Sequence, residues 1–463
     1  MAVPDIPPIV LDRGGAAPLG VQLAGELRAA AASGVLRAGD RLPSTRALAA
    51  TLGISRTVTA AAYEQLLAEG WVAGRTGSGT FVTAVPAATA PAAGPQRPAV
   101  ARAAGAGIDL RAGTPCVEVL DRSAWRRAWR AAADAAPDAA PRPEGLPEFG
   151  AAVVEHLLRH RGLPADPADV LGTAGSTAAI AELARTLPRG ARVAVEEPGY
   201  RRAARALAEA GLTVVPARVD ARGLVVDALP AGLAAVYCTP AHQFPMGGRL
   251  PAARRMALVQ RARAEGFLII EDDYDGELRY DVAPLPLLAA LGPDVVVHLG
   301  TASKLLTPTL GAGWLVGPSA VRAAVLGHRD RTGSRPSPAG QRVFAAFAAH
   351  GDLARHLRRL RRELAGRRTA VAAAVGAVGH AVAGDAAGAH VVVPLAGAAA
   401  ERAVLASAAD RGIALDGLAR HHGAADRGPR GAGLVLGFAG PARADLERAL
   451  PVVADVLAAH APV

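Results

Sequence analysis

Short apolar runs alternate with helix-like segments through much of the chain, and this alternation restricts the fold more than any other feature. The runs are RVAVEE (192–197), LTVVPA (212–217), LAAVYCTP (233–240), FLIIEDD (267–273), VVVHLG (295–300) and GWLVG (313–317). Segments rich in Ala, Arg and Leu, such as 201–210 and 252–265, separate them. Strands that are apolar on both faces and alternate with helices are typical of a mostly parallel sheet covered on both sides. We therefore predict an α/β fold for this region.

Polar side chains follow two of these runs. Asp272 and Asp273 end the run at 267–273, and the segment TASK (301–304) follows the run at 295–300. Ligands of parallel sheets bind at the carboxyl ends of the strands. We therefore expect the two polar groups to lie at the same edge of one sheet, although they are far apart in sequence.

Lys304 is the only lysine among the 51 Lys and Arg residues. The abundance of Ala, Gly, Pro and Arg is what a GC-rich coding sequence produces, so the number of arginines says little about function. Lysine alone offers a primary amine that forms a Schiff base with an aldehyde. The alternative is a chance surface lysine, and the position of Lys304 after an apolar strand favours the chemical interpretation.

The residues near Lys304 match the requirements of pyridoxal 5'-phosphate (PLP). This cofactor needs an amine, a carboxylate at its pyridine nitrogen, donors for its phosphate and a ring beside its own. Lys304 supplies the amine, Asp272 (in preference to Asp273) the carboxylate, and Tyr274 a donor to the phenolic oxygen. Small residues before a helix expose N–H groups to a phosphate. The phosphate and ring contacts are expected from Gly175, Ser176, Thr177, Thr301, Ser303 and Tyr200.

Each of these residues has a simpler interpretation when it is taken alone. The segment 175–177 is also a common helix cap, the Asp272-Asp273 pair also suits a metal or a solvated turn, and Tyr200 also suits packing. Their joint occurrence with the sole lysine favours PLP. The two cysteines are far apart in sequence, so we predict neither a metal site nor a disulfide.

The N-terminal region has the pattern of a helix-turn-helix. Leu19, Leu23 and Leu27 predict a first helix that ends near Gly34. Ser44 and Ser55 are candidate N-caps of two further helices joined by a Gly-containing turn. In the last helix we expect Val58, Ala62 and Leu66 to be buried, and Arg56, Thr57 and Thr59 to face outward.

A Gly-rich hairpin over residues 71–82 follows this helix and predicts a wing. Bulk charge does not support DNA binding, because residues 1–85 hold seven Arg against six Asp and Glu. The placement of Arg41, Arg46, Arg56 and Arg75 in the turn, helix and wing does support it. A protein-interaction module is the alternative.

Composition divides the chain into three parts. We predict a winged helix-turn-helix domain at 1–85, a Pro/Ala-rich linker at 86–107 and a PLP domain at 108–463, whose residues after about 330 form a smaller C-terminal domain. The sequence contains neither a long apolar span nor a signal-peptide pattern, so we expect a cytoplasmic protein without membrane segments.

Two resemblances accompany these patterns. Residues 38–82 (AGDRLPSTRALAATLGISRTVTAAAYEQLLAEGWVAGRTGSGTFV) resemble the GntR family of winged-helix regulators. Residues from about 108 to 440 resemble the fold-type I aminotransferase domain of MocR-type regulators, on the segments IDLRAGTP, EEPGY, TPAHQFPMG, IIEDDYDGELRY and LGTASK. The resemblance implies a homodimer, a double-stranded DNA operator and PLP on Lys304. The expected DNA contacts are Arg41, Ser44, Arg46, Ser55, Arg56, Thr57, Arg75 and Gly77.

The chain departs from the family pattern at three positions. The family has an arginine for the phosphate seven residues after the lysine, where this chain has Gly311. Enzymes of this fold use a C-terminal arginine for the substrate carboxylate, near the position of Val435 here, and Met246 replaces a small hydroxyl residue. These changes argue against an efficient transaminase. We therefore expect a regulator that senses PLP or an amine or amino-acid effector; the alternatives are an active aminotransferase and a regulator that has lost PLP.

Overall fold

A computed structural model describes residues 9–15, 17–75, 78–83, 107–280, 286–423 and 431–460. The chain forms two compact units, Met1–Ala104 and Gly105–Val463. Each unit is described by itself.

The first unit has three helices and a two-stranded hairpin among its described residues. The elements are α1 (Leu19–Ala32), α2 (Thr45–Leu52), α3 (Arg56–Ala68), β1 (Val72–Arg75) and β2 (Gly79–Val82). The side chains of Ser44 and Ser55 accept hydrogen bonds from Ala47 N and Val58 N, so both serines are the expected N-caps. Strands β1 and β2 pair antiparallel as the expected wing.

The buried face of α3 differs from the one expected. Thr59 is fully buried, whereas we expected it to face outward, and Val58 is only half-buried. Ala62, Tyr63 and Leu66 complete the buried face. The helix packs against both α1 and α2, so its apolar face is centred about one residue later than the spacing of Val58, Ala62 and Leu66 suggested.

The second unit is built on an eight-stranded sheet, counted over the described residues, in the order β4-β11-β10-β9-β8-β5-β6-β7. Strands β11 and β7 run antiparallel to the other six, so the expected mostly parallel sheet is confirmed. The strands are β4 (Val170–Thr173), β5 (Arg192–Glu197), β6 (Thr213–Asp220), β7 (Gly223–Leu224), β8 (Ala235–Cys238), β9 (Leu268–Asp273), β10 (Val296–Thr301) and β11 (Gly313–Val316).

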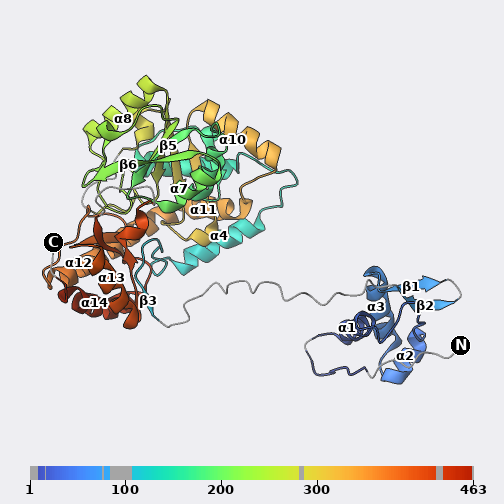
Figure 1. Ribbon diagram of the computed structural model, residues 1–463. Helices are drawn as coiled ribbons and strands as arrows, with labels where there is room; N and C mark the ends of the chain where they lie inside the picture. Colours follow the sequence, from blue (N-terminus) through green and yellow to red (C-terminus); the bar gives the residue numbers. More distant parts are fainter. Residues whose placement is uncertain are drawn as a thin grey trace. The chain divides into compact units, whose positions relative to one another are not determined.

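Helices cover both faces of this sheet, as Figure 1 shows. Successive residues of a strand point to opposite faces of the sheet. In β9, Ile270 packs with helices α6, α7 and α10, whereas Ile269 packs with α5, α8 and α11. The helices of this layer are α4 (Arg122–Asp134), α5 (Pro147–Arg161), α6 (Ser176–Ala184), α7 (Arg201–Glu209), α8 (Ala252–Glu265), α9 (Leu288–Leu291), α10 (Ser319–Thr332) and α11 (Pro338–Ala349).

The C-terminal part forms a smaller layer around the sheet β12-β15-β14. Its elements are α12 (Asp352–Gly376), β12 (His390–Leu395), α13 (Ala398–Asp410), β13 (Ile413–Ala414), β14 (Asp416–Gly417), β15 (Ala432–Gly437) and α14 (Arg443–Ala458), and β13 pairs with β3 (Ile108–Asp109). Short 3₁₀ helices lie at Pro167–Asp169, Val226–Ala228, Pro308–Leu310 and Leu418–His421. None of the described helices combines the length and apolarity needed to cross a bilayer.

Gly300 lies so close to Trp314 that a substitution at this glycine tests how tightly the centre of the sheet is packed. Gly300 pairs with Trp314 across β10 and β11, and a Cβ at position 300 would overlap the indole ring. We expect Gly300→Ala to lower the free energy of unfolding by about 1–3 kcal/mol because Trp314 is buried and cannot move aside. Urea unfolding measures this change. The control is Gly366→Ala in α12, where a Cβ meets nothing and helix propensity predicts a gain of about 0.5–1 kcal/mol. Equal stability of Gly300→Ala and the parent would contradict the prediction.

Candidate cofactor site and DNA-binding surface

Parallel pairing of β9 with β10 brings the two polar groups of the sequence analysis together. Asp272 lies opposite Leu299 and Asp273 opposite Gly300. The segment 301–304 continues from the end of β10. The carboxyl ends of the two strands therefore meet at one edge of the sheet, as expected.

Lys304 is held by the backbone of a distant segment. Its Nζ donates to the carbonyl oxygen of Gly113 at 2.5 Å. Burial lowers the pKa of Lys304, while the nearby Asp275 and Asp272 act in the opposite direction. A lysine whose pKa is lowered has a larger share of the neutral amine, which is the form that attacks an aldehyde.

Asp272 has one carboxylate oxygen in use and one available. Its Oδ2 accepts a hydrogen bond from the Tyr237 hydroxyl at 2.7 Å, whereas Oδ1 is buried and has no partner among the described residues. Burial raises the pKa of Asp272 to about 6, and the hydroxyl groups of Tyr237 and Ser176 partly offset this rise. A buried, unpartnered acceptor is costly. An N–H at the pyridine position of a cofactor would satisfy it, so Asp272 fits the predicted group.

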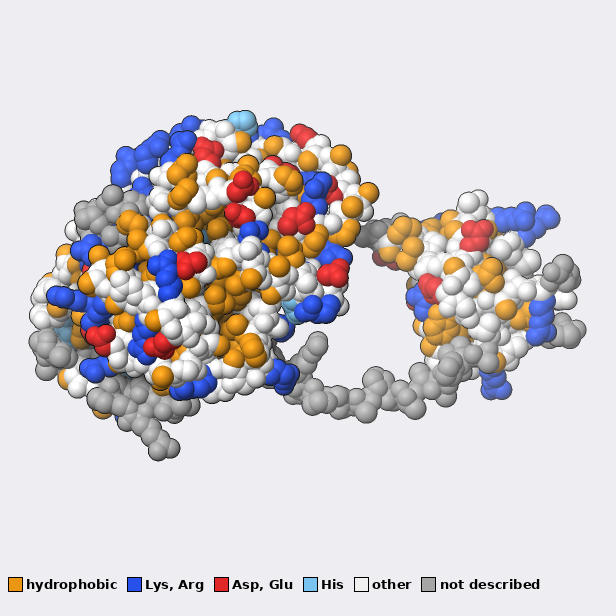
Figure 2. Space-filling model, turned by 90° about the horizontal axis from the view of Figure 1, so that it is seen from above, with side chains coloured by type: hydrophobic (Ala, Val, Ile, Leu, Met, Phe, Trp, Pro, Cys, Tyr) orange, Lys and Arg blue, Asp and Glu red, His pale blue; other side chains and the backbone are white. Residues whose placement is uncertain are grey.

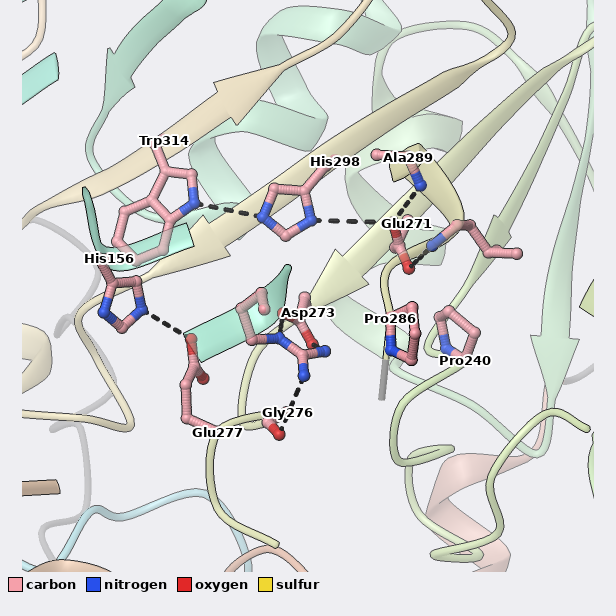
Figure 3. Close-up of polar contacts among 12 residues, drawn as sticks. His156, Pro240, Glu271, Asp273, Gly276, Glu277, Pro286, Ala289, His298 and Trp314 are labelled. Carbon is pink, nitrogen blue, oxygen red and sulfur yellow. Dashed lines mark hydrogen bonds and ion pairs between the residues drawn. The ribbon is translucent and has the colours of Figure 1, made fainter. Parts of the chain in front are cut away.

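Asp273 belongs to a buried polar network that does not include Asp272, as Figure 3 shows. Its two oxygens accept from Arg161 Nε and Nη2 at 2.7 and 2.8 Å, and Arg161 is fully buried. Successive side chains of a strand point to opposite faces, so Asp272 and Asp273 cannot both serve one ligand. The ion pair with Arg161 leaves Asp272 as the candidate.

A wider buried network supports this strand (Figure 3). His156 Nε2 lies 2.8 Å from Glu277 Oε1, and hydrogen bonding to His156 opposes the effect of burial, so the pKa of Glu277 is lowered to about 2. Glu271 accepts from the backbone N–H groups of Leu288 and Ala289 at 2.7 and 3.0 Å. The network ties β9 to α5 and to the segment before β10.

The expected phosphate-binding residues converge at the start of α6. Gly175 has a φ of +120°, and a Cβ there would lie 3.6 Å from Thr301 Oγ1 and 3.9 Å from Ser303 Oγ. Thr301 Oγ1 donates to Ser303 Oγ at 2.9 Å. No side chain caps α6, so its first N–H groups point toward this cradle of hydroxyls, with Ser176 and Thr177 in the first turn. The arrangement suits an anion.

Tyr200 borders the same cradle. Its hydroxyl lies 3.0 Å from Thr177 Oγ1. Arg202, two residues further along α7, lies close enough to affect the pKa values of both Tyr200 and Lys304. Sequence analysis did not single out Arg202, which brings a guanidinium to the surroundings of Tyr200 and Lys304.

Two of the three departures, Gly311 and Val435, have different surroundings. Gly311 caps a 3₁₀ helix with a φ of +59°, where a Cβ meets nothing within 4 Å. An arginine there would have space but would adopt a strained backbone conformation. Val435 is fully buried in an apolar cluster with Val392 and Leu418.

The segment 239–247 is anchored by a buried carboxyl. Glu196 Oε2 accepts from the hydroxyl of Thr239 at 2.6 Å and from the amide of Gln243 at 3.2 Å, and burial raises the pKa of Glu196 to about 7. His242, in the same segment, receives a hydrogen bond from the Tyr274 hydroxyl at its carbonyl oxygen, at 3.0 Å. Tyr274 therefore lies beside His242.

The first unit presents the expected DNA contacts at its surface. All of these residues that are described are exposed: Arg41, Ser44, Arg46, Ser55, Arg56, Thr57 and Arg75; Gly77 lies outside the described residues. Arg46 and Arg56 have no carboxylate partner in the described part of the chain, and Arg75 stacks 4.9 Å from the Phe81 ring centroid. Figure 2 shows basic side chains projecting at separate points of this unit.

Sequence analysis missed residues that act through distant contacts. Gly113 and Tyr237 hold Lys304 and Asp272, and Arg13 donates to the Gly53 carbonyl in the turn between α2 and α3. The segment IDLRAGTP carried part of the resemblance, but no local pattern marked Gly113 as the partner of Lys304.

Two family models match the chain. The model of bacterial regulatory proteins of the gntR family matches residues 19–82, and that of aminotransferase class I and II matches residues 106–420. Two solved structures share the fold of the second unit. They are Pyrococcus horikoshii kynurenine aminotransferase (TM-score 0.69, 24% identity, 77% of this chain and 91% of that one) and an archaeal alanine:glyoxylate aminotransferase (0.70, 22%, 76% and 91%).

Curated relatives match most of the chain. The HTH-type pyridoxine biosynthesis transcriptional regulator PdxR of Corynebacterium glutamicum is 36% identical over 364 residues, 79% of this chain and 80% of that protein. The probable rhizopine catabolism regulatory protein MocR of Rhizobium meliloti is 33% identical over 380 residues, 76% of each. The chain therefore belongs to the family of MocR-type transcriptional regulators, in which a GntR-type DNA-binding domain is joined to an aminotransferase class I and II domain.

Proposed function

We propose that this regulator binds PLP at Lys304 and that the cofactor, or an amine or amino-acid effector that reaches it, changes the affinity for operator DNA. The observation that carries the proposal is the pairing of the sole lysine with Asp272, whose buried Oδ1 lacks a partner among the described residues. Most buried side-chain oxygens have a hydrogen-bond partner, so an unpartnered one beside the sole lysine supports a bound ligand.

Each residue of the candidate site would bind a different part of PLP. PLP supplies an aldehyde that condenses with primary amines. Lys304 provides the amine, and Asp272 keeps a proton on the pyridine nitrogen. The start of α6, with Gly175, Ser176 and Thr177, and the hydroxyls of Thr301 and Ser303 hold the phosphate. Tyr200 borders the ring. Tyr274 would donate to the phenolic oxygen once its hydroxyl turns from the His242 carbonyl oxygen, to which it donates in this structure.

Regulation requires two states that bind the ligand with different affinity. We propose that the protein acts as a cytoplasmic homodimer, and that PLP binding shifts the relative placement of its two DNA-binding domains. The domains would follow the division at 1–85, 86–107 and 108–463. The proposed DNA contacts are Arg41, Ser44, Arg46, Ser55, Arg56, Thr57, Arg75 and Gly77. Ser44 and Ser55 also cap α2 and α3.

An aminotransferase remains the second candidate, because the amine and pyridine ends of the site are complete. The buried Val435 counts against it, since a valine cannot pair with a substrate carboxylate. Steady-state turnover of an amino acid and an oxoacid would establish this candidate.

Replacement of Lys304 tests the proposal directly. We expect wild-type protein incubated with PLP to develop a visible absorption band and, after borohydride reduction, to carry one adduct on Lys304. Lys304→Ala should show neither, because the substitution removes the only lysine side chain in the sequence. PLP should change the affinity of wild-type protein for the DNA upstream of its gene, and this change should be lost in Lys304→Ala. Unchanged affinity and footprint of the wild type with PLP would refute the sensing role.

The raised pKa of Asp272 predicts a pH dependence of PLP binding. The carboxylate pairs with the protonated pyridine nitrogen when it is ionised, so its contribution is present above pH 6 and is lost as the pH falls through about 6. We expect wild-type protein to bind PLP about 10–100 times more tightly than Asp272→Asn at pH 8, and this ratio to approach one at pH 5. The ratio cancels titration of the cofactor phosphate. A ratio that does not vary with pH would exclude this role.

Arg56 tests the DNA surface. A phosphate contact adds about 0.9 to the slope of log affinity against log salt. We therefore expect Arg56→Ala to weaken operator binding and to reduce that slope by about 0.9. The matched control is Arg28→Ala, because Arg28 pairs with Glu69 at 2.7 Å and lies outside the expected contacts. If both variants have the wild-type slope, Arg56 does not contact a phosphate.

A further inference from the structure

One side of the surroundings of Lys304 is apolar. The residues Val392, Leu418 and Val435 are buried together, with the partly buried Ala112, Met246 and Ala383 packed against them; we call these six residues the Val435 cluster. Ala112 is adjacent to Gly113, whose carbonyl oxygen accepts from Lys304 Nζ at 2.5 Å. The Val435 cluster therefore begins one residue from the contact of the reactive amine.

Another side is aromatic. The ring of Phe244 lies 5.1–6.1 Å, between centroids, from four other rings, which with it form what we call the Phe244 cluster: Tyr200, Tyr274, His390 and His421. Phe, Trp and Tyr make up only 3% of the chain, so this concentration is local. Such rings offer large apolar surfaces to a ligand.

The cations next to these clusters are already occupied or neutral. Arg111 binds both oxygens of Asp109, and Arg420 lies 2.9 Å from Asp416. Burial, followed by the effect of His242, lowers the pKa of His390 to about 3, so its imidazole is neutral near pH 7. His421 lies 3.3 Å from Asp416. These side chains do not offer a free positive charge to a carboxylate.

The unsatisfied polar atoms near Lys304 are acceptors. Asp272 Oδ1 and Asp275 Oδ1 are buried and have no hydrogen-bond partner within the described residues. Asp275 also lies 2.9 Å from His242 through its other oxygen. Because the pyridine nitrogen of PLP would take Asp272 Oδ1, Asp275 is the carboxylate left beside the amine; it attracts an ammonium group and repels the carboxylate of an amino acid.

Arg202 is the exception among the nearby cations. It acts on Tyr200, whose hydroxyl lies 3.0 Å from Thr177 at the start of α6. It also acts on Lys304 itself, so it is the one cation near the amine whose part in carboxylate binding has to be tested.

We propose, as an extension of the proposed function, that the effector accepted beside Lys304 is a primary amine with an apolar or aromatic substituent and without a carboxylate on the carbon that bears the amine. The Val435 and Phe244 clusters would contact the substituent, and the acceptors would favour the cationic amine.

Matched pairs of ligands test this proposal on the full-length wild-type protein loaded with PLP. The pairs are 2-phenylethylamine with L-phenylalanine, and n-butylamine with L-norvaline, which differ only in the carboxylate. The readouts are the visible spectrum and the affinity for the upstream DNA. We expect each amine to change the spectrum and the DNA affinity at a concentration about 10–100 times lower than its amino acid does. The reason is that the carboxylate of the amino acid would lack a charge-assisted hydrogen bond in this site.

The outcomes separate this proposal from the one on which it rests. An amino acid that acts at the same or a lower concentration than its amine overturns the effector class. If PLP alone changes DNA binding and none of the four ligands acts, the effector class is wrong and PLP sensing stands. If PLP produces no band and no change in DNA binding, the proposed function fails as well.

Variants test whether the Val435 cluster is what disfavours an effector with a carboxylate. Val435→Arg, or Met246→Arg at a half-buried position of the same cluster, should increase the response to L-phenylalanine about 10–100-fold in protein that still loads PLP. Absence of any gain in both loaded variants would show that the Val435 cluster does not face the ligand. A wild-type response to L-phenylalanine that Arg202→Ala abolishes would identify Arg202 as a carboxylate partner and overturn the proposal.

Discussion

Strands β9 and β10 lie side by side and parallel in the middle of the large sheet, and the candidate site depends on this pairing. The register puts Asp272 opposite Leu299, and the chain then reaches Lys304 just beyond the end of β10. Alternation along β9 sends Asp272 to the face of Tyr237 and α6, and sends Glu271 and Asp273 to the other face. A shift of one residue would exchange the two aspartates and put the Arg161-paired carboxylate at the site.

The two faces of β9 differ in how their charges are satisfied. Behind the strand, Asp273 and Glu271 have full sets of partners in the buried network. In front of it, Asp272 keeps an oxygen without a partner in the described structure and has a raised pKa. A buried unsatisfied group in a native structure calls for an explanation, and a bound ligand is one. The partners of Asp273 and Glu271 hold the strand, and with it the unsatisfied oxygen of Asp272, in position.

The rest of the site also combines groups that are present with groups that are missing. The cradle of Gly175, Thr301 and Ser303 is formed, whereas Gly311 and Val435 leave positions without a guanidinium. The groups that would hold PLP lie together, whereas a group that would orient an amino acid for turnover is replaced by Val435. This combination agrees with a regulator in which an aminotransferase fold has become a ligand-binding domain.

Sequence alone determined the features that depend on local physics. The apolar runs became strands, Ser44 and Ser55 cap their helices, and Lys304 stood out because no other lysine exists. Only the tertiary structure decided which groups meet. Tyr237 and Asp272 are 35 residues apart and Gly113 and Lys304 are 191 apart, so no periodicity links them. Thr59 was misjudged for the same reason: burial depends on the helices that pack against α3, and a single helix pattern does not contain that information.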